Sequence, residues 1–193
     1  MLRKIKLRLL VLALVAMAVT LMSQGSLAYY STVGKATNVV TSGNLQLMIH
    51  ETTDQGTPFP EDGMYVIPGD IVSKVVTVEN ACQHPFYLRV KAVFGSTAEE
   101  LSAEECLALN INTENWIYHD GWYYFETVLA PGEVTPWFFS QVEVIGSSID
   151  TSLIGKTLQL TVLAQAVQSE NNPVENGDVT AALGWPADKE GTT

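Results

Sequence analysis

Apolar residues recur at every second position along much of this chain, and this period constrains the fold more than any other feature. One apolar face in residues 157–168 is formed by Leu158, Leu160, Val162, Ala164 and Ala166. The same spacing recurs in Phe86, Leu88, Val90, Ala92 and Phe94. Because successive side chains of a β-strand point to opposite faces, each pattern predicts a strand with one face in a core. In the second strand the alternation leaves Arg89 and Lys91 on the other face.

Turn sequences separate the predicted strands. Asp120-Gly121 lies between the aromatic runs 116–119 and 122–125 and predicts a hairpin, because a two-residue type I′ turn needs positive φ at both positions. Pro68-Gly69-Asp70 and Pro131-Gly132-Glu133 predict two turns of similar construction. About eight or nine short strands joined in this way predict an all-β fold, an antiparallel β-sandwich or a barrel.

Residues 96–109 are the one place where the sequence favours a helix. Ser96 or Thr97 can cap its first turn, in which Glu99 and Glu100 suit the positive end of the helix. We therefore expect one short helical insertion in the sandwich.

The N-terminal residues 1–28 have the organisation of a secretory signal peptide. Four basic residues precede an uncharged apolar run, 9–21, and Ser26 and Ala28 are the small residues of a cleavage site. A membrane span would need about 20 apolar residues, which is longer than this run, so the pattern favours cleavage over a retained anchor. Cleavage after Ala28 makes Tyr29 the new N-terminus and leaves no stable membrane span.

Removal of the leader leaves residues 29–193, a length that suits a single β-sandwich domain with a flexible C-terminal tail. Four of the ten basic residues are lost with the leader, so six remain against 21 acidic residues, a net charge of −15. A nucleic-acid partner requires clustered Lys and Arg, which this chain does not have. We expect a secreted protein with no nucleic-acid partner.

The mature chain has two cysteines, Cys82 and Cys106. In an oxidising exterior they can form one disulfide that closes a loop of about two dozen residues and contributes on the order of 3 kcal/mol. The alternative is two separate thiols packed as small apolar residues. Their spacing does not indicate a zinc site, and the sequence leaves the two alternatives open.

The residues directly behind the cleavage site, 29–40, are rich in aromatic, β-branched and small polar types and predict an extended strand. A turn signal at 41–44 and an alternating segment at 45–49 follow. This strand has no tight hairpin that specifies its partner, so it can pair in its own sheet or in that of another copy. Head-to-tail pairing of that kind does not close and produces a filament.

A set of short motifs is distributed over nearly the whole mature chain. They are the leader ending at Ala28, Tyr29-Tyr30-Ser31, Ala36-Thr37-Asn38, Gly43-Asn44-Leu45, Pro68-Gly69-Asp70, Val76-Thr77-Val78-Glu79-Asn80, Tyr87-Leu88-Arg89-Val90, Leu129-Ala130-Pro131-Gly132-Glu133, Ala164-Gln165-Ala166-Val167-Gln168 and Trp185. Together these motifs resemble the TasA/camelysin family, whose members are exported in Gram-positive bacteria through a SipW-type signal peptidase. The resemblance implies that the sandwich is a jelly-roll-like antiparallel β-sandwich. The segment 81–85 and Gln46 depart from the family pattern.

The resemblance implies a protein of the extracellular matrix or cell surface that builds biofilm fibres with itself and other matrix proteins. It also implies that the N-terminal strand, freed by processing, inserts into the next subunit. The expected donor-strand residues are Tyr29, Tyr30, Val33, Ala36, Val39 and Val40. No cofactor, metal or catalytic residue is expected for this function.

Two other classes of protein remain alternatives. The resemblance to camelysin also suggests a surface metalloprotease, but His50, His84 and His119 are isolated and no His-Glu-x-x-His motif is present. A carbohydrate-binding or adhesive module is the other alternative, because aromatic residues cluster at 116–124 and can form a stacking platform. Aromatic residues on a hairpin more often pack in a core.

Overall fold

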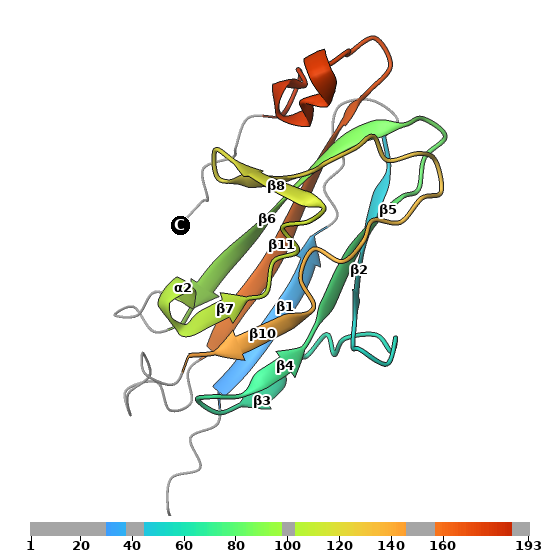
Figure 1. Ribbon diagram of the computed structural model, residues 1–193. Coiled ribbons are helices and arrows are strands. Elements are labelled where there is room, and N and C mark those ends of the chain that lie inside the picture. The colour runs from blue at the N-terminus through green and yellow to red at the C-terminus, as the bar shows by residue number, and fades with distance from the viewer. Residues whose placement is uncertain (1–29, 38–44, 98–102, 146–156, 187–193) are drawn as a thin grey trace, which may run out of the picture.

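Strands are the main secondary structure in the computed structural model, which describes residues 30–37, 45–97, 103–145 and 157–186 (Figure 1). Nearly all strand pairs in these ranges are antiparallel, and a single four-residue α-helix interrupts them. The prediction of an all-β sandwich with one short helical insertion is therefore confirmed. The predicted cleavage-site residues Ser26, Ala28 and Tyr29, and the strand residues Val39 and Val40, lie outside the described residues.

The larger layer is a six-stranded sheet with the spatial order β3-β1-β11-β6-β9-β8. Its strands are β1 (Tyr30–Thr37), β3 (Met64–Val66), β6 (Phe86–Ser96), β8 (Trp116–His119), β9 (Trp122–Phe125) and β11 (Thr157–Gln168). β11 and β6 pair antiparallel along almost their whole length, from Leu158 with Ser96 to Gln168 with Phe86. These two long strands form the centre of the layer.

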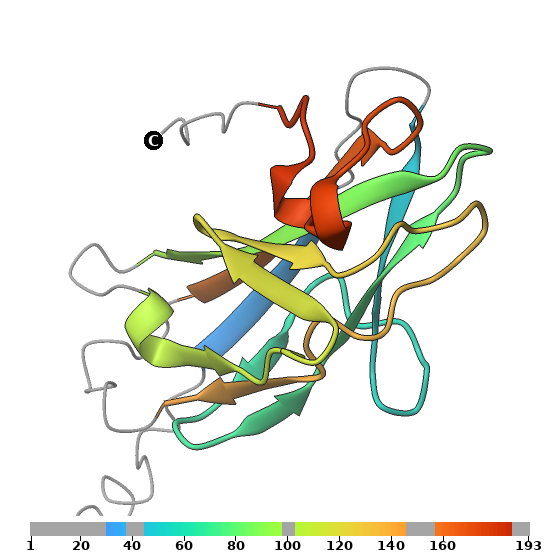
Figure 2. The same cartoon turned by 45° about the horizontal axis from the view of Figure 1, so that its top comes forward.

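The smaller layer consists of two short sheets that hydrogen bonds join into one surface. Its strands are β2 (Leu47–Thr52), β4 (Ile71–Ser73), β5 (Val75–Asn80), β7 (Leu107–Leu109) and β10 (Gln141–Val144). Only Lys74 separates β4 from β5, and the segment before β10 bonds to β5 through Phe138 N to Val76 O at 2.7 Å. Figures 1 and 2 show this layer lying across one face of the six-stranded sheet.

The core lies between the two layers and confirms the period-two prediction. Leu158, Leu160, Val162, Ala164 and Ala166 are each at most 2% exposed. They belong to one cluster with Val76 and Val78 of β5 and Val142 and Val144 of β10. Alternation along β11 and β6 therefore identified the buried face of the central strands.

The hairpin turn and the two Pro-Gly-acid turns predicted from the sequence are present in the structure. Asp120 and Gly121 have φ angles of 48° and 80°, as the hairpin between β8 and β9 requires. In the two Pro-Gly-acid turns, the acidic side chain accepts a hydrogen bond from the backbone N–H that lies just ahead of the proline. These bonds run from Ile67 N to Asp70 Oδ2 at 2.8 Å and from Ala130 N to Glu133 Oε2 at 2.9 Å.

The helix α2 (Ala103–Cys106) falls within the segment predicted to be helical, but it is shorter than that segment. Ser96, proposed as a helix cap, is the last residue of β6 instead. Within the described part of the chain, no helix is long and apolar enough to cross a membrane.

Candidate functional site

The N-terminal strand occupies an interior position in the six-stranded sheet. β1 lies between β11 and β3, so both of its edges are paired. With β11 it runs parallel, from Ser31 opposite Thr157 to Thr37 opposite Leu163. With β3 it runs antiparallel over a shorter stretch, beginning with Tyr30 opposite Val66. We call the space between β11 and β3 the strand slot.

The strand slot is lined in part by buried residues of β11. The register places Thr32, Gly34 and Ala36 opposite Leu158, Leu160 and Val162. These three β11 residues are 0%, 2% and 0% exposed. Removing β1 would therefore open one edge of β11 and bring water to part of the core.

Both partners of β1 are distant in sequence. β1 ends at Thr37, whereas β3 begins at Met64 and β11 begins at Thr157. A parallel partner cannot be reached by a tight hairpin, so pairing of β1 with β11 depends on a long connection in any case. The expected donor residues Tyr30, Val33 and Ala36 lie in β1, opposite Val66, Gln159 and Val162.

The two cysteines are free thiols at opposite ends of β6. Cys82 precedes this 11-residue strand and Cys106 ends α2 near its far end (Figure 1). At about 3.3 Å per residue, β6 spans roughly 35 Å, whereas a disulfide needs Cα atoms within about 7 Å. The disulfide alternative is therefore incompatible with this fold. Burial raises the pKa of the Cys106 thiol, which keeps it protonated and unreactive.

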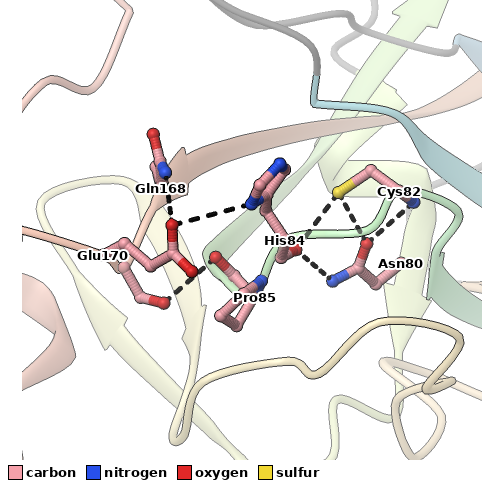
Figure 3. A network of polar contacts seen from close by, with 7 residues as sticks. Asn80, Cys82, His84, Pro85, Gln168 and Glu170 are labelled. Atoms are coloured by element: carbon pink, nitrogen blue, oxygen red, sulfur yellow. Dashed lines mark hydrogen bonds and ion pairs between the residues drawn. The ribbon is translucent and has the colours of Figure 1, made fainter.

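Figure 3 shows Cys82 in a network of polar contacts at the turn between β5 and β6. Its Sγ donates to Asn80 Oδ1 at 2.9 Å and to the backbone oxygen of His84 at 3.1 Å. The His84 ring faces Glu170 instead, with Nδ1 3.6 Å from Oε2. The thiol is therefore engaged with acceptors and not with the imidazole that could activate it as a nucleophile.

Asn80 explains why this network forms. Its side chain is fully buried, and Nδ2 donates to the backbone oxygens of His84 and Leu129, both at 2.9 Å. Its Oδ1 accepts from Cys82 N at 3.0 Å. The Asn80 amide therefore links two turns through hydrogen bonds, and its role is structural.

The three histidines do not converge. His50 Nε2 lies 2.7 Å from Glu79 Oε2 on the smaller layer, His84 is in the turn before β6, and His119 ends β8. No group of three or more His, Cys, Asp or Glu residues in the described ranges could hold a metal ion. A zinc hydrolase needs three converging ligands, and the described residues do not bring three such groups together.

The aromatic hairpin packs mostly inward. Trp116, Trp122 and Tyr124 are each at most 4% exposed, whereas Tyr118, at 64%, stands in solvent. Trp116 contacts Phe125 and Phe138 with ring centroids 5.4 and 5.3 Å apart. The cluster is therefore core packing and does not form a flat platform for stacking a sugar.

Sequence reasoning missed a second, smaller core on the outer face of the six-stranded sheet. We call residues 169–186, which include η3 (Glu175–Gly177) and η4 (Val179–Ala181), the C-terminal strap. Figure 2 shows the strap lying over this face. Its Val179 and Ala182 are buried against residues of β6, β9 and β11, namely Tyr87, Trp122, Tyr124 and Val167.

Arg89 is the centre of this second core. It lies on the face opposite the main core, as alternation predicted, but the strap covers it and leaves it only 8% exposed. Its guanidinium lies 4.3 Å from the Trp122 ring centroid and 4.8 Å from that of Trp185. It donates to Gln165 Oε1 through Nε at 2.9 Å and Nη2 at 2.6 Å, and to the backbone oxygen of Pro186 at 3.1 Å. One arginine therefore fastens the strap to the sheet.

Lys74 is the other buried cation among the described side chains. It lies between Val72 and Val76 on the core side of the smaller layer and is 2% exposed. Its Nζ is 2.9 Å from Glu51 Oε2 and 4.2 Å from the Phe59 ring centroid. Burial lowers the pKa of Lys74, and the charge of Glu51 opposes this shift. The sequence contains a signal for the burial of Lys74, because this residue shares the alternate positions of Val72, Val76 and Val78.

An open groove of about 400 Å³ lies beside β3 and β4, next to the strand slot. Its lining mixes apolar residues such as Met64 and Ile71 with Asp54, Thr57 and Ser73. The described residues around it do not include a histidine, a cysteine or a lysine that could act as a catalytic group.

Comparison with known proteins does not assign a family. No protein-family model matches the chain, and neither a curated protein nor a solved structure matches it. The fold and the strand slot are therefore the features that bear on the function of this chain.

Proposed function

We propose that this chain is a secreted structural subunit that polymerises into extracellular matrix fibres by donating its N-terminal strand to the next copy. The observation that carries the proposal is the position of β1. A strand that directly follows an expected cleavage site fills an interior slot of the sheet and pairs on both edges. The SipW-type signal peptidase, and membership of the TasA/camelysin family, are parts of the same proposal.

Exchange of this strand between copies should cost little enthalpy. The backbone bonds of β1 with β11 and β3 are the same whether β1 comes from its own chain or from a neighbour, so exchange is nearly neutral in enthalpy. Only one connection, residues 38–44, leads from β1 to the rest of the sandwich. Those seven residues can extend over at most roughly 25 Å, which allows β1 to reach an adjacent copy.

The position of β1 also explains why strand donation would produce a stable polymer. An empty strand slot exposes the edge of β11 and part of the core, and both are energetically unfavourable in water. A copy whose own β1 has left therefore gains stability by accepting the β1 of another copy. Repetition of this step without closure yields a filament.

The test is deletion of residues 29–40 from the mature chain. We expect a folded monomer by circular dichroism and no polymer by sedimentation, because β11, β6, β9 and β8 remain paired without β1. A synthetic peptide of residues 29–40 should bind the open slot and raise the melting temperature of the deletion variant. Filaments that persist without the segment would refute strand donation.

A single substitution gives a matched control. Thr37→Pro removes a backbone donor from β1 and should reduce polymerisation strongly, because proline is poorly tolerated inside a paired strand. Thr37→Ala keeps the backbone N–H and should polymerise like the parent. Equal polymerisation of the two variants would show that pairing of β1 is not required.

A further inference from the structure

The described surface of this protein carries many carboxylates and few cations. Thirteen of its acidic residues are exposed: Asp54, Glu61, Asp62, Glu104, Glu105, Glu114, Asp120, Glu126, Glu133, Glu143, Glu170, Glu175 and Asp178. Among the described side chains, Lys74 and Arg89 are buried and Lys91 is half-buried, so none of these three cations is exposed.

The fold itself produces this imbalance. The mature chain has six basic residues, and two of them are used inside the molecule. Lys74 pairs with Glu51 in the main core, and Arg89 fastens the C-terminal strap. Their charges are therefore not available to neutralise carboxylates on a neighbouring copy. The expected net charge is −15, and thirteen of the described acidic residues are exposed.

Charge of this size opposes the approach of two copies. Strand donation requires backbones to approach to about 4.8 Å, the spacing of paired strands. The Debye length is about 30 Å at 0.01 M salt but only about 8 Å at 0.15 M. At low salt, carboxylates across a whole domain repel those of the next copy, whereas at physiological salt only the nearest groups interact.

We propose that polymerisation of this chain is controlled by mobile cations, which screen the carboxylate surface and allow copies to exchange β1. This inference rests on the proposed function. The partner is the small cation of the surrounding solution, acting through ionic strength. The described residues contain no group of three ligands for a specific metal site, which favours screening over a specific bridge.

The test is sedimentation of the mature chain, residues 29–193, across a series of NaCl concentrations from about 10 to about 500 mM. We expect the concentration of protein required for polymer to fall at least about tenfold across the series. MgCl₂ at equal ionic strength should have the same effect as NaCl. Polymerisation that is independent of salt would overturn screening, as would activity of MgCl₂ at a much lower ionic strength.

Charge variants keep the test specific to the surface. Replacing Glu104, Glu105, Glu114 and Glu143 together with Gln should lower the salt required for half-maximal polymer by about twofold. Replacing Gln55, Gln83 and Gln141 with Glu should raise it similarly, and circular dichroism checks that both variants fold. Unchanged midpoints would contradict the inference while leaving strand donation intact. Absence of polymer at every ionic strength would instead contradict the proposed function.

Discussion

Arg89→Ala should strongly destabilise the protein, and alternation of apolar residues alone does not predict this effect. The side chain is 8% exposed, lies between Trp122 and Trp185, and donates to Gln165 and the Pro186 backbone. A desolvated cation–π contact contributes up to about 2 kcal/mol and a hydrogen bond to a charged group about 1.5–3 kcal/mol. Because such terms are not additive, we expect a loss of about 3–5 kcal/mol in the free energy of unfolding.

The assay is urea denaturation followed by the fluorescence of the four tryptophans, two of which, Trp122 and Trp185, contact Arg89. With an m-value of about 2 kcal/mol/M, the midpoint should fall by roughly 2 M. Lys91→Ala is the matched control, because Lys91 is on the same strand but half-buried, with Nζ 5.8 Å from the Trp122 ring centroid. Its cost should be below about 1 kcal/mol. Arg89→Lys should lie between the two, since lysine lacks the planar fork. Equal midpoints for Arg89→Ala and Lys91→Ala would refute the role assigned to Arg89.

Three further predictions concern the core, the buried ion pair and the cleavage site. Leu160→Ala should lower the free energy of unfolding by roughly 2–5 kcal/mol through lost burial and a cavity, and Thr161→Ala, on the other face, should lower it much less. Equal shifts in melting temperature for the two variants would contradict the assignment of faces. Glu51→Gln should lower the free energy of unfolding by about 3 kcal/mol or more, because it leaves the Lys74 charge buried without its partner. The double variant Lys74→Met and Glu51→Leu should recover most of that stability, and thermal denaturation measures both variants. Ala28→Arg should leave an uncut precursor in the membrane fraction, and recovery of a chain that begins at Tyr29 would disprove the cleavage site.

The sequence predicted the strands and turns whose signals are local. Alternation along residues 86–94 and 157–168 depends on one face being buried, and the structure buries that face. The Asp120-Gly121 hairpin and the two Pro-Gly-acid turns follow from φ preferences of single residues. These features needed no knowledge of the rest of the fold.

The features that the sequence did not predict depend on contacts between distant segments. The sequence placed Arg89 correctly on the face opposite the main core, but nothing near it in sequence indicates that Trp185 covers it there. The parallel pairing of β1 with β11 joins the first and last strands and has no local signal. The choice between a disulfide and free thiols for Cys82 and Cys106 required the length and direction of β6.

The most direct measurement asks whether β1 of one copy pairs with β11 of another. Lys35 and Thr161 are opposite each other in the β1–β11 register, at a strand spacing of about 4.8 Å that suits a disulfide. One protein would carry Lys35→Cys and a second Thr161→Cys, both with Cys82→Ser and Cys106→Ala so that no other thiol is present.

The two single-cysteine proteins are mixed under polymerising conditions and oxidised, and a chain that carries both substitutions serves as the control for pairing within one copy. Strand donation predicts a disulfide-linked heterodimer from the mixture, and disulfide-linked ladders from the chain with both cysteines. If the mixture remains monomeric while the doubly substituted chain closes its disulfide internally, β1 stays in its own sheet and the proposed mechanism is contradicted.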